Sequence, residues 1–288
     1  MEGTVDIWGV RWPKMVSETS LTAIKNFEVR DDDVWIATWP KAGTHWMAEI
    51  CQLIRNEGEL DKVDREQAPM PLEFESPSKE KQPRYLAAPS WKSPRVLVTH
   101  VPKQLLPDQL RAEQCKAKVI TVIRNLKDSL VSFHYFRKGM VQNNDTTFET
   151  SLQKHLYADK VEFSSWFDHS LGYWAERHNE RNLVLKYEDM KRDTRGTVVQ
   201  VADFLGRPLS DDVIDKITEL ASVKSMKTRY HKEGELRDES RPKIGAPNLV
   251  RKGVVGDWKA TFTVAQSEAF DEFYRQKMAG SDLKMEFE

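Results

Sequence analysis

Residues 34–56 read VWIATWPKAGTHWMAEICQLIRN, and this stretch decides the fold that we expect. Its first six residues are mostly β-branched or aromatic, which is typical of a buried strand. Pro40 and Gly43 then mark a turn. After the turn, apolar residues recur at three- and four-residue spacing, which predicts a helix that begins near Thr44. The stretch therefore predicts a strand, a tight loop and a helix whose N-terminus points at the loop.

The loop at 40–43 has the ingredients of a phosphate-binding corner. The free N–H groups and the positive dipole end of a helix N-terminus attract anions, and Lys41 adds a full charge beside them. In a Walker P-loop the lysine follows the second glycine and precedes Ser or Thr, whereas Lys41 precedes Gly43. The pattern predicts a P-loop-like site for a phosphate-bearing ligand, although an ordinary turn with a solvated lysine has the same residues.

The rest of the chain alternates between strand and helix patterns. The expected strands are 34–39, 95–99, 119–123 and 182–186, and the expected helices are 44–56, 127–136, 164–177, 197–205 and 210–221. Such alternation predicts an α/β fold with a mainly parallel central sheet flanked by helices. We expect one domain over residues 1–288, with an irregular excursion at 57–94.

Polar side chains follow each expected strand. They are Lys41, His100, Arg124 and the pair Tyr187 and Glu188. Ligands of open parallel sheets lie beyond the carboxyl ends of the strands, so these side chains should converge at one edge. Each residue alone has a structural explanation, but together the cations would bind a polyanion, and a histidine can accept a proton near neutral pH.

Composition limits the classes of partner. The 288 residues include 44 basic and 45 acidic side chains, so no overall charge favours nucleic acid or an anionic membrane. No apolar run is long enough for a transmembrane helix and the N-terminus has no secretory pattern, so we expect a cytoplasmic protein. Cys51 and Cys115 have no metal or redox spacing and are expected to be reduced thiols.

Three motifs resemble those of the cytosolic sulfotransferases. The family's TYPKSGTTW loop corresponds to TWPKAGTHW at 38–46, and its 3′-phosphate motif to IRNLKDSLVS at 123–132. Its C-terminal signature corresponds to RKGVVGDWK at 251–259. The similarity extends from about residue 30 to residue 280.

The resemblance implies transfer of a sulfuryl group from 3′-phosphoadenosine 5′-phosphosulfate (PAPS) to a hydroxyl or amine of a small acceptor, without a metal. It implies catalytic roles for Lys41, for His100 as general base, and for Ser132. The donor-binding residues that it implies are Lys41, Ala42, Gly43, Thr44, His45, Trp46, Arg124, Ser132, Tyr187, Ala221, Ser222, Val223, Met226, Val250, Arg251, Lys252 and Gly253. Trp46 would stack on the adenine.

The sequence departs from the family pattern at three positions. Val98 stands where relatives commonly have a lysine, two residues before the catalytic histidine, so either Lys41 acts without that helper or another residue replaces it. His45 replaces a threonine and could bind phosphate or cap the helix. Val223 stands where a phenylalanine often contacts adenine, which predicts a one-sided adenine pocket.

Acceptor binding, a lid and a dimer are further expectations. Phe74, Tyr85, Phe136 and His100 are candidates for contact with an aromatic or alicyclic acceptor. The charged segment 229–250, rich in Gly and Pro, could be a mobile lid or a solvated loop. The residues that match the family's dimerisation segment are Lys259, Thr263, Val264 and Glu268. The sequence leaves open whether the acceptor is a phenol, a steroid, an amine or another alcohol.

Two other functions share these residues. A nucleotide-dependent phosphotransferase would use the Lys41 corner for ATP and would need Mg²⁺ on Glu188 or Asp189. A non-catalytic protein could bind adenosine bisphosphate without transferring a group. Activity in excess chelator would separate the first alternative from a sulfotransferase.

Overall fold

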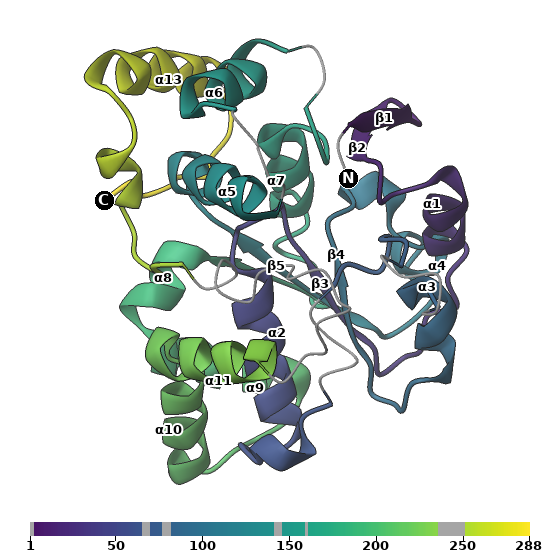
Figure 1. Ribbon diagram of the computed structural model, residues 1–288. Helices are drawn as coiled ribbons and strands as arrows, with labels where there is room; N and C mark the ends of the chain where they lie inside the picture. Colours follow the sequence, from purple (N-terminus) through teal and green to yellow (C-terminus); the bar gives the residue numbers. More distant parts are fainter. Residues whose placement is uncertain (1–2, 65–69, 77–81, 141–145, 159–160, 236–250) are drawn as a thin grey trace.

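The computed structural model describes residues 3–64, 70–76, 82–140, 146–158, 161–235 and 251–288 (Figure 1). Its centre is a four-stranded sheet in the order β4-β3-β5-β6, in which every neighbouring pair is parallel. The strands are β3 (Val34–Ala37), β4 (Val96–Thr99), β5 (Lys118–Ile123) and β6 (Asn182–Lys186). The predicted α/β fold with a parallel central sheet is therefore confirmed.

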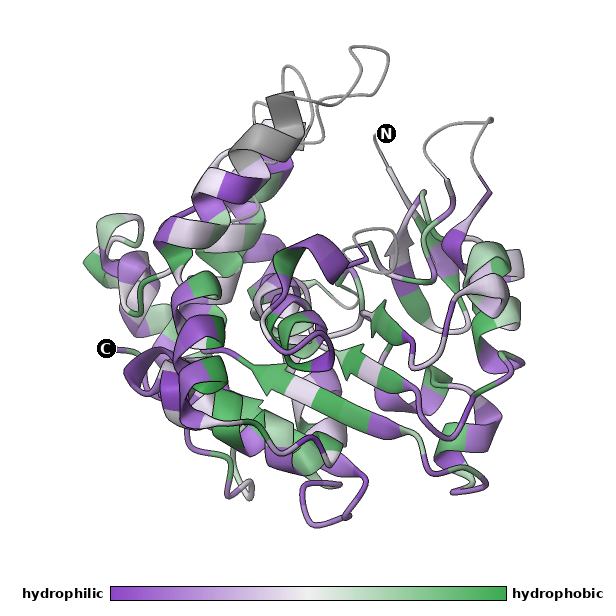
Figure 2. Cartoon of the chain, turned by 90° about the horizontal axis from the view of Figure 1, so that it is seen from below, coloured by the Kyte–Doolittle hydropathy of each residue, from purple (hydrophilic) through white to green (hydrophobic). Residues whose placement is uncertain are grey.

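The central strand β3 is buried along its whole length. Successive side chains of a strand point to opposite faces, and the two faces of β3 contribute to different hydrophobic clusters. Ile36 packs in the cluster that contains Met47 of the following helix. Trp35 packs in the cluster on the other face, where its ring meets Phe27 edge-on with centroids 5.6 Å apart. Figure 2 shows the apolar strands enclosed between helices.

Helices cover both faces of the sheet (Figure 1). The α-helices among the described residues are α1 (Glu18–Lys25), α2 (Thr44–Arg55), α3 (Arg84–Ala87), α4 (Asp108–Arg111), α5 (Leu126–Met140), α6 (Phe148–Tyr157), α7 (Trp166–Trp174), α8 (Tyr187–Arg192), α9 (Thr194–Leu205), α10 (Asp211–Leu220), α11 (Val223–Glu235) and α13 (Val264–Lys277). The 3₁₀ turns are η1 (Leu60–Lys62), η2 (Ala88–Ser90), η3 (Lys103–Leu105) and η4 (Asp257–Ala260). None of the helices in the described part of the chain has the length and apolar character needed to cross a bilayer.

Several elements were not predicted. An N-terminal hairpin pairs β1 (Thr4–Ile7) with β2 (Val10–Pro13) in antiparallel fashion. Helices α4, α6 and α8 were also missed. The expected excursion at 57–94 is largely irregular, with short turns at η1, α3 and η2.

The expected lid falls partly on a helix. Residues 229–235 form the end of α11, and Arg229 is anchored there because its Nη2 donates to Glu49 Oε1 at 2.9 Å and to the Leu220 carbonyl at 2.7 Å. The assignment of 229–235 to a loop is therefore wrong. The remainder of the expected lid, 236–250, lies outside the described residues, as does Val250.

Candidate active site

The loop after β3 is closed by short-range contacts. Lys41 and Gly43 have positive φ angles of 68° and 112°, and Gly43 is the N-cap of α2. A Cβ atom on Gly43 would lie 3.0 Å from the ring of Tyr187, so glycine permits this close approach. The hydroxyls of Thr38 and Thr44 lie 2.6 Å apart and join the two ends of the loop. The first turn of α2, including His45, is thereby fixed beside β3.

Lys41 is a cation without a carboxylate partner among the described residues. Its Nζ lies 4.1 Å from the centroid of the Phe136 ring on α5. Burial, and next the charges of Arg124 and Arg251, lower the pKa of Lys41 to about 7. The basic groups predicted to converge therefore lie close enough to repel one another.

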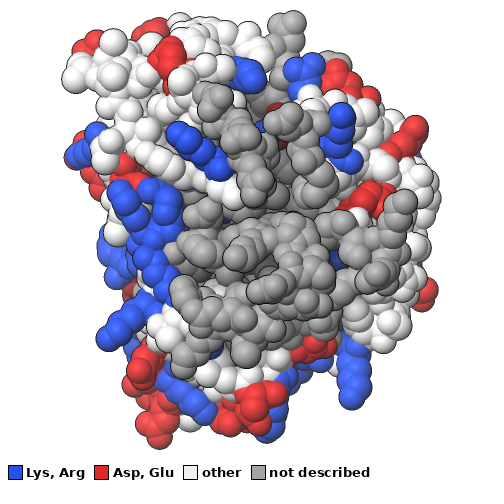
Figure 3. All heavy atoms as spheres, viewed as in Figure 1, with Lys and Arg blue, Asp and Glu red and all other residues white. Residues whose placement is uncertain are grey.

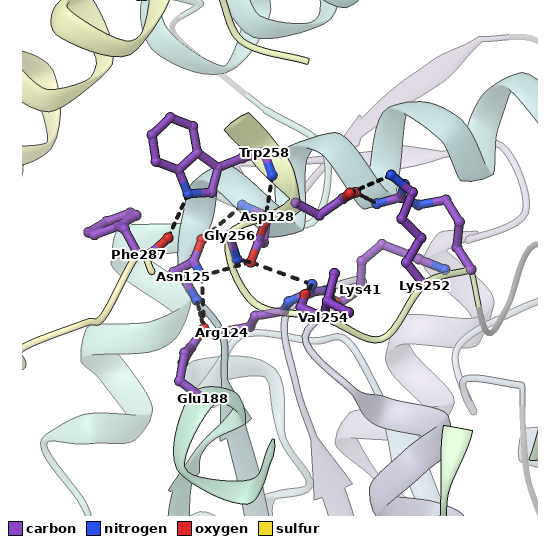
Figure 4. Close-up of polar contacts among 12 residues, drawn as sticks. Lys41, Arg124, Asn125, Asp128, Glu188, Lys252, Val254, Gly256, Trp258 and Phe287 are labelled. Carbon is purple, nitrogen blue, oxygen red and sulfur yellow. Dashed lines mark hydrogen bonds and ion pairs between the residues drawn. The ribbon is translucent and has the colours of Figure 1, made fainter. Parts of the chain in front are cut away.

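Arg124 joins three segments that are distant in sequence. Its Nη1 donates to the Lys41 carbonyl at 3.3 Å, and its Nη2 donates to the Val254 carbonyl at 3.1 Å (Figure 4). Its guanidinium lies 4.3 Å from the centroid of the Tyr187 ring. The loop after β3, the end of β5 and the C-terminal signature thus meet at this side chain.

A buried carboxylate fixes the C-terminal signature to α5. Asp128 accepts hydrogen bonds from the backbone N–H groups of Gly256 at 2.9 Å and Trp258 at 3.0 Å (Figure 4). Asn125 donates to the same carboxylate at 3.0 Å and to Glu188 Oε1 at 3.0 Å. These bonds bring the 123–132 and 251–259 motifs together as the sequence predicted.

Asp257 holds the two basic residues at the start of the C-terminal signature. Lys252 Nζ lies 2.5 Å from one carboxylate oxygen, and Arg251 pairs with the other. Gly253 follows with a φ angle of 66°, and a Cβ there would lie only 2.5 Å from Val223 Cγ2. The backbone of 253 therefore packs directly on the position where relatives often have a phenylalanine. Lys and Arg side chains also gather on the surface beside α8 and the C-terminus (Figure 3).

Several buried donors around these cations have no hydrogen-bond partner in the part of the chain that the structure describes. They are Arg124 Nε, Arg251 Nε, Trp46 Nε1 and Ser129 Oγ. Buried polar groups are normally hydrogen-bonded, so unpartnered donors beside Lys41 fit an anionic ligand with many oxygen atoms.

The expected adenine pocket is assembled from α2, α8, α10 and α11. Trp46, Tyr187, Ala221 and Met226 belong to one hydrophobic cluster. The rings of Trp46 and Tyr187 meet edge-on with centroids 5.4 Å apart. Lys191 Nζ lies 5.4 Å from the Trp46 ring, a contact that the sequence did not suggest.

His100 lies just beyond β4 with a defined tautomer. Its Nδ1 is 2.8 Å from the Thr38 carbonyl, which can only accept, so Nδ1 carries the proton and Nε2 presents a lone pair. Burial, and to a smaller extent the Lys41 charge, lower the pKa of His100 to about 4 against the opposing effect of the Thr38 bond. The imidazole is therefore neutral near pH 7, as a general base requires.

Glu73 supports the backbone of His100 and was missed in the sequence. Its Oε1 accepts the His100 N–H at 2.7 Å, and its Oε2 accepts the Thr99 hydroxyl at 2.9 Å. Burial raises the pKa of Glu73 to about 7. Glu73 lies in the irregular excursion, where no periodicity marks a buried residue.

Aromatic rings surround His100. Its ring centroid lies 6.3 Å from that of Phe74 and 5.5 Å from that of Phe163, which the sequence did not single out. Phe136 instead lies under Lys41. Tyr85 has a different setting, because its hydroxyl donates to Glu75 Oε2 at 3.2 Å and its ring is buried in the core. Its role in acceptor binding stays a prediction.

Three further predicted positions are placed by their elements. Ser132 lies on α5, which also carries Phe136. Ser222 lies between α10 and α11, and its hydroxyl accepts the Ser225 N–H at 3.2 Å. Val98 is only 2% exposed and packs with Ile36 in the core, so its side chain contributes to the core and supplies no charge to the site.

The chain is similar to known proteins over most of its length. The family model described as "Sulfotransferase domain" matches residues 31–282. The chain belongs to the sulfotransferase family. Sulfotransferase 1C2 of Rattus norvegicus is 37% identical to this sulfotransferase over 262 residues, which cover 90% of this chain and 88% of the relative. Sulfotransferase 1A1 of Bos taurus is 38% identical over 280 residues, covering 93% and 91% of the two chains.

Solved sulfotransferase structures share the fold. Mouse sulfotransferase SULT7A1 complexed with PAP has a TM-score of 0.77 and 28% identity, covering 97% of this chain and 96% of that chain. Retinol dehydratase in a complex with retinol and PAP has a TM-score of 0.75 at 21% identity, which shows a common fold. The resemblance drawn from the three motifs is therefore confirmed.

The residues of the expected dimerisation segment surround the start of α13. Lys259 Nζ forms an ion pair with Glu288 at 2.9 Å, and Thr263 caps the helix by accepting the Gln266 N–H at 3.2 Å. Val264 is 76% exposed, and Glu268 lies one turn further along the helix. A dimer through this segment stays a prediction.

Proposed function

We propose that this sulfotransferase transfers a sulfuryl group from PAPS to the hydroxyl or amine of a small aromatic or alicyclic acceptor, with His100 as general base. The observation that carries the proposal is the gathering of Lys41, Arg124 and Arg251 about one corner, beside a neutral histidine. Cations supply the field that a polyanionic donor needs, and the histidine supplies a proton acceptor.

The donor would lie across the motifs that the structure brings together. The backbone N–H groups at 42–45 would bind the 5′-phosphate at the N-terminus of α2. Arg124, Arg251 and Ser132, with Lys252 and the Gly253 N–H, would bind the 3′-phosphate. The adenine would lie by Trp46 and the 221–226 segment. The mouse relative complexed with PAP supports this assignment.

The site residues have distinct tasks in the transfer. Bound PAPS supplies an activated S–O bond that breaks as the acceptor oxygen or nitrogen forms its own bond to sulfur. His100 Nε2 takes the acceptor proton as the new bond forms. Protonated Lys41 stabilises the negative charge that develops on the bridging oxygen of the departing phosphate. Because position 98 is a valine, Lys41 performs this task without the second lysine that relatives commonly have.

The phosphotransferase alternative finds little support in the carboxylates that it would use. Glu188 Oε1 accepts two hydrogen bonds from Asn125, from N at 2.9 Å and from Nδ2 at 3.0 Å. Asp189 forms an ion pair with Arg192 at 2.7 Å. One oxygen of each carboxylate is thus engaged in a structural contact, while Glu188 Oε2 has no partner among the described residues.

The test is transfer of radiolabelled sulfate from PAPS to a panel of phenols, steroids, amines and alcohols in excess chelator. We expect labelled product from at least one class. His100→Ala should lower kcat roughly 10²- to 10⁴-fold while leaving the affinity for adenosine 3′,5′-bisphosphate (PAP) unchanged. Arg124→Ala should mainly raise the KM for PAPS.

Two results would separate the alternatives. Nucleotide binding without transfer to any acceptor would indicate a non-catalytic binder. Full turnover by His100→Ala would refute the assignment of the base.

A further inference from the structure

His155 on α6 carries a buried nitrogen that has no hydrogen-bond partner among the described residues. Its Nδ1 lies 2.8 Å from the Ser151 carbonyl, which only accepts, so the proton is on Nδ1. Nε2 then holds a bare lone pair, and this atom is buried without a donor. Burial lowers the pKa of His155, so the ring is neutral near pH 7 and Nε2 is a hydrogen-bond acceptor.

The ring of His155 packs among aromatic side chains that connect it with His100. That ring meets Trp39 and Phe133 edge-on, each with centroids 6.1 Å apart. The ring centroid of Phe133 lies 6.5 Å from that of Phe163, and the ring centroid of Phe163 lies 5.5 Å from that of His100. A continuous series of ring contacts through Phe133 and Phe163 therefore connects His155 with His100.

The charged neighbours of His155 leave this nitrogen unsatisfied. Arg137 and Glu162 form an ion pair with each other, and with Lys154 they are the charges that act on the ring. None of them donates to Nε2. A buried acceptor without a donor is costly, and phenylalanine would have filled the same aromatic surroundings without that cost. A donor from a bound molecule would satisfy the nitrogen.

We propose that His155 Nε2 accepts a hydrogen bond from a second hydroxyl or N–H group on the acceptor substrate. The inference rests on the proposed function and narrows the substrate class to aromatic acceptors with two polar groups. One group is sulfated at His100, and the other is held at His155. His155 is then a specificity-determining residue, because it touches the acceptor but takes no part in the transfer.

The experiment compares acceptors that differ in one donor. The probes are a biphenyl and a naphthalene with hydroxyls at opposite ends, each beside its monomethyl ether, which keeps the size but loses the donor. For each probe, kcat/KM is expressed per sulfatable hydroxyl. We expect the wild-type protein to favour the diol of at least one pair by about tenfold, the value of one hydrogen bond to a buried group. His155→Phe should bring that ratio close to one.

Matched variants and controls make each outcome decisive. His155→Gln keeps an acceptor oxygen and should retain a larger ratio than His155→Phe. Tyr157→Phe, on the exposed face of the same helix, should leave the ratio unchanged. Turnover without preference in the wild-type protein, or an undiminished preference in His155→Phe, overturns the inference alone. Failure to sulfate every probe and every member of the wider panel, with PAP still bound, overturns the proposed function itself.

Discussion

Burial lowers the pKa of both residues at the proposed reaction centre, His100 and Lys41, but with different consequences. It lowers the pKa of His100 to about 4, which keeps the imidazole neutral and ready to accept a proton. The pKa of Lys41 falls to about 7 because of burial and, to a smaller extent, because the charges of Arg124 and Arg251 oppose its protonation. Without a bound anion, Lys41 is therefore only partly protonated near neutral pH. Binding of phosphate groups should restore its charge.

This coupling predicts that PAP binding depends on pH. The protonated form of Lys41 attracts the nucleotide, and its population falls as the pH rises above about 7. Between about pH 7 and pH 9 the dissociation constant of PAP should therefore increase with pH, by a factor that approaches ten for each pH unit. This range lies above the pH at which phosphate itself titrates. Isothermal titration calorimetry in buffers of different ionisation enthalpy should show proton uptake.

Lys41→Met provides the control for this titration. It should bind PAP more weakly near pH 7 and show a much flatter dependence on pH. A dissociation constant that stays the same for the wild-type protein across this range would exclude Lys41 as the linked group.

The sequence predicted those site residues that follow strands or stand in motifs, and missed those placed by the tertiary fold. Lys41, His100 and Arg124 follow buried strands, so their convergence could be inferred from topology. Glu73 and Phe163 lie in irregular segments, and no local spacing shows that they meet His100.

At the scale of elements, α5 organises the donor side of the site. Its first turn carries Lys127, which is 2% exposed although it is charged. Lys127 Nζ donates to Ser267 at 2.7 Å, pairs with Asp271 at 2.7 Å, and lies 4.1 Å from the centroid of the Trp258 ring. With the bonds of Asp128, this cation holds the C-terminal signature and α13 against α5, which carries Ser132.

Lys127→Met should therefore destabilise the protein. The variant loses a desolvated cation–π contact and an ion pair to α13, at a cost of roughly 2–3 kcal/mol. In a chain of this size, that loss of stability corresponds to a fall in Tm of roughly 5 °C. Differential scanning calorimetry measures it, with the exposed Lys284→Met as control, which should stay within about 0.5 kcal/mol of the wild type. Equal melting temperatures for Lys127→Met and Lys284→Met would contradict the stabilising role of Lys127.

Helices and strands were predicted best where their burial gives the sequence a regular spacing or a run of apolar residues. All four strands of the parallel sheet were expected from their apolar runs, and α2 from its amphipathic spacing. The strands of the hairpin β1–β2 have only four residues each, and β1 is exposed except at Ile7, so the apolar pattern there is too short to predict a strand. The charge-rich end of α11 resembles a loop in sequence, but Arg229 is anchored there by its bonds to Glu49 and Leu220.

At the scale of the whole molecule, the exposed start of α13 is the surface that the family resemblance assigns to dimerisation. We predict that the wild-type protein is a dimer in solution and that Val264→Glu shifts it to a monomer, because a charge would be buried in the contact. Sedimentation velocity measures the change. Leu86→Glu, at another exposed apolar residue, should remain dimeric. A monomeric wild-type protein, or a dimer of Val264→Glu, would refute this assignment.

The most direct test of the central claim is a crystal structure of this protein with PAP. The account predicts that the 3′-phosphate contacts Arg124 and Arg251, and that the 5′-phosphate lies at the N-terminus of α2 beside Lys41. Nucleotide bound away from these three cations, or cations that turn to separate surfaces in the complex, would contradict it.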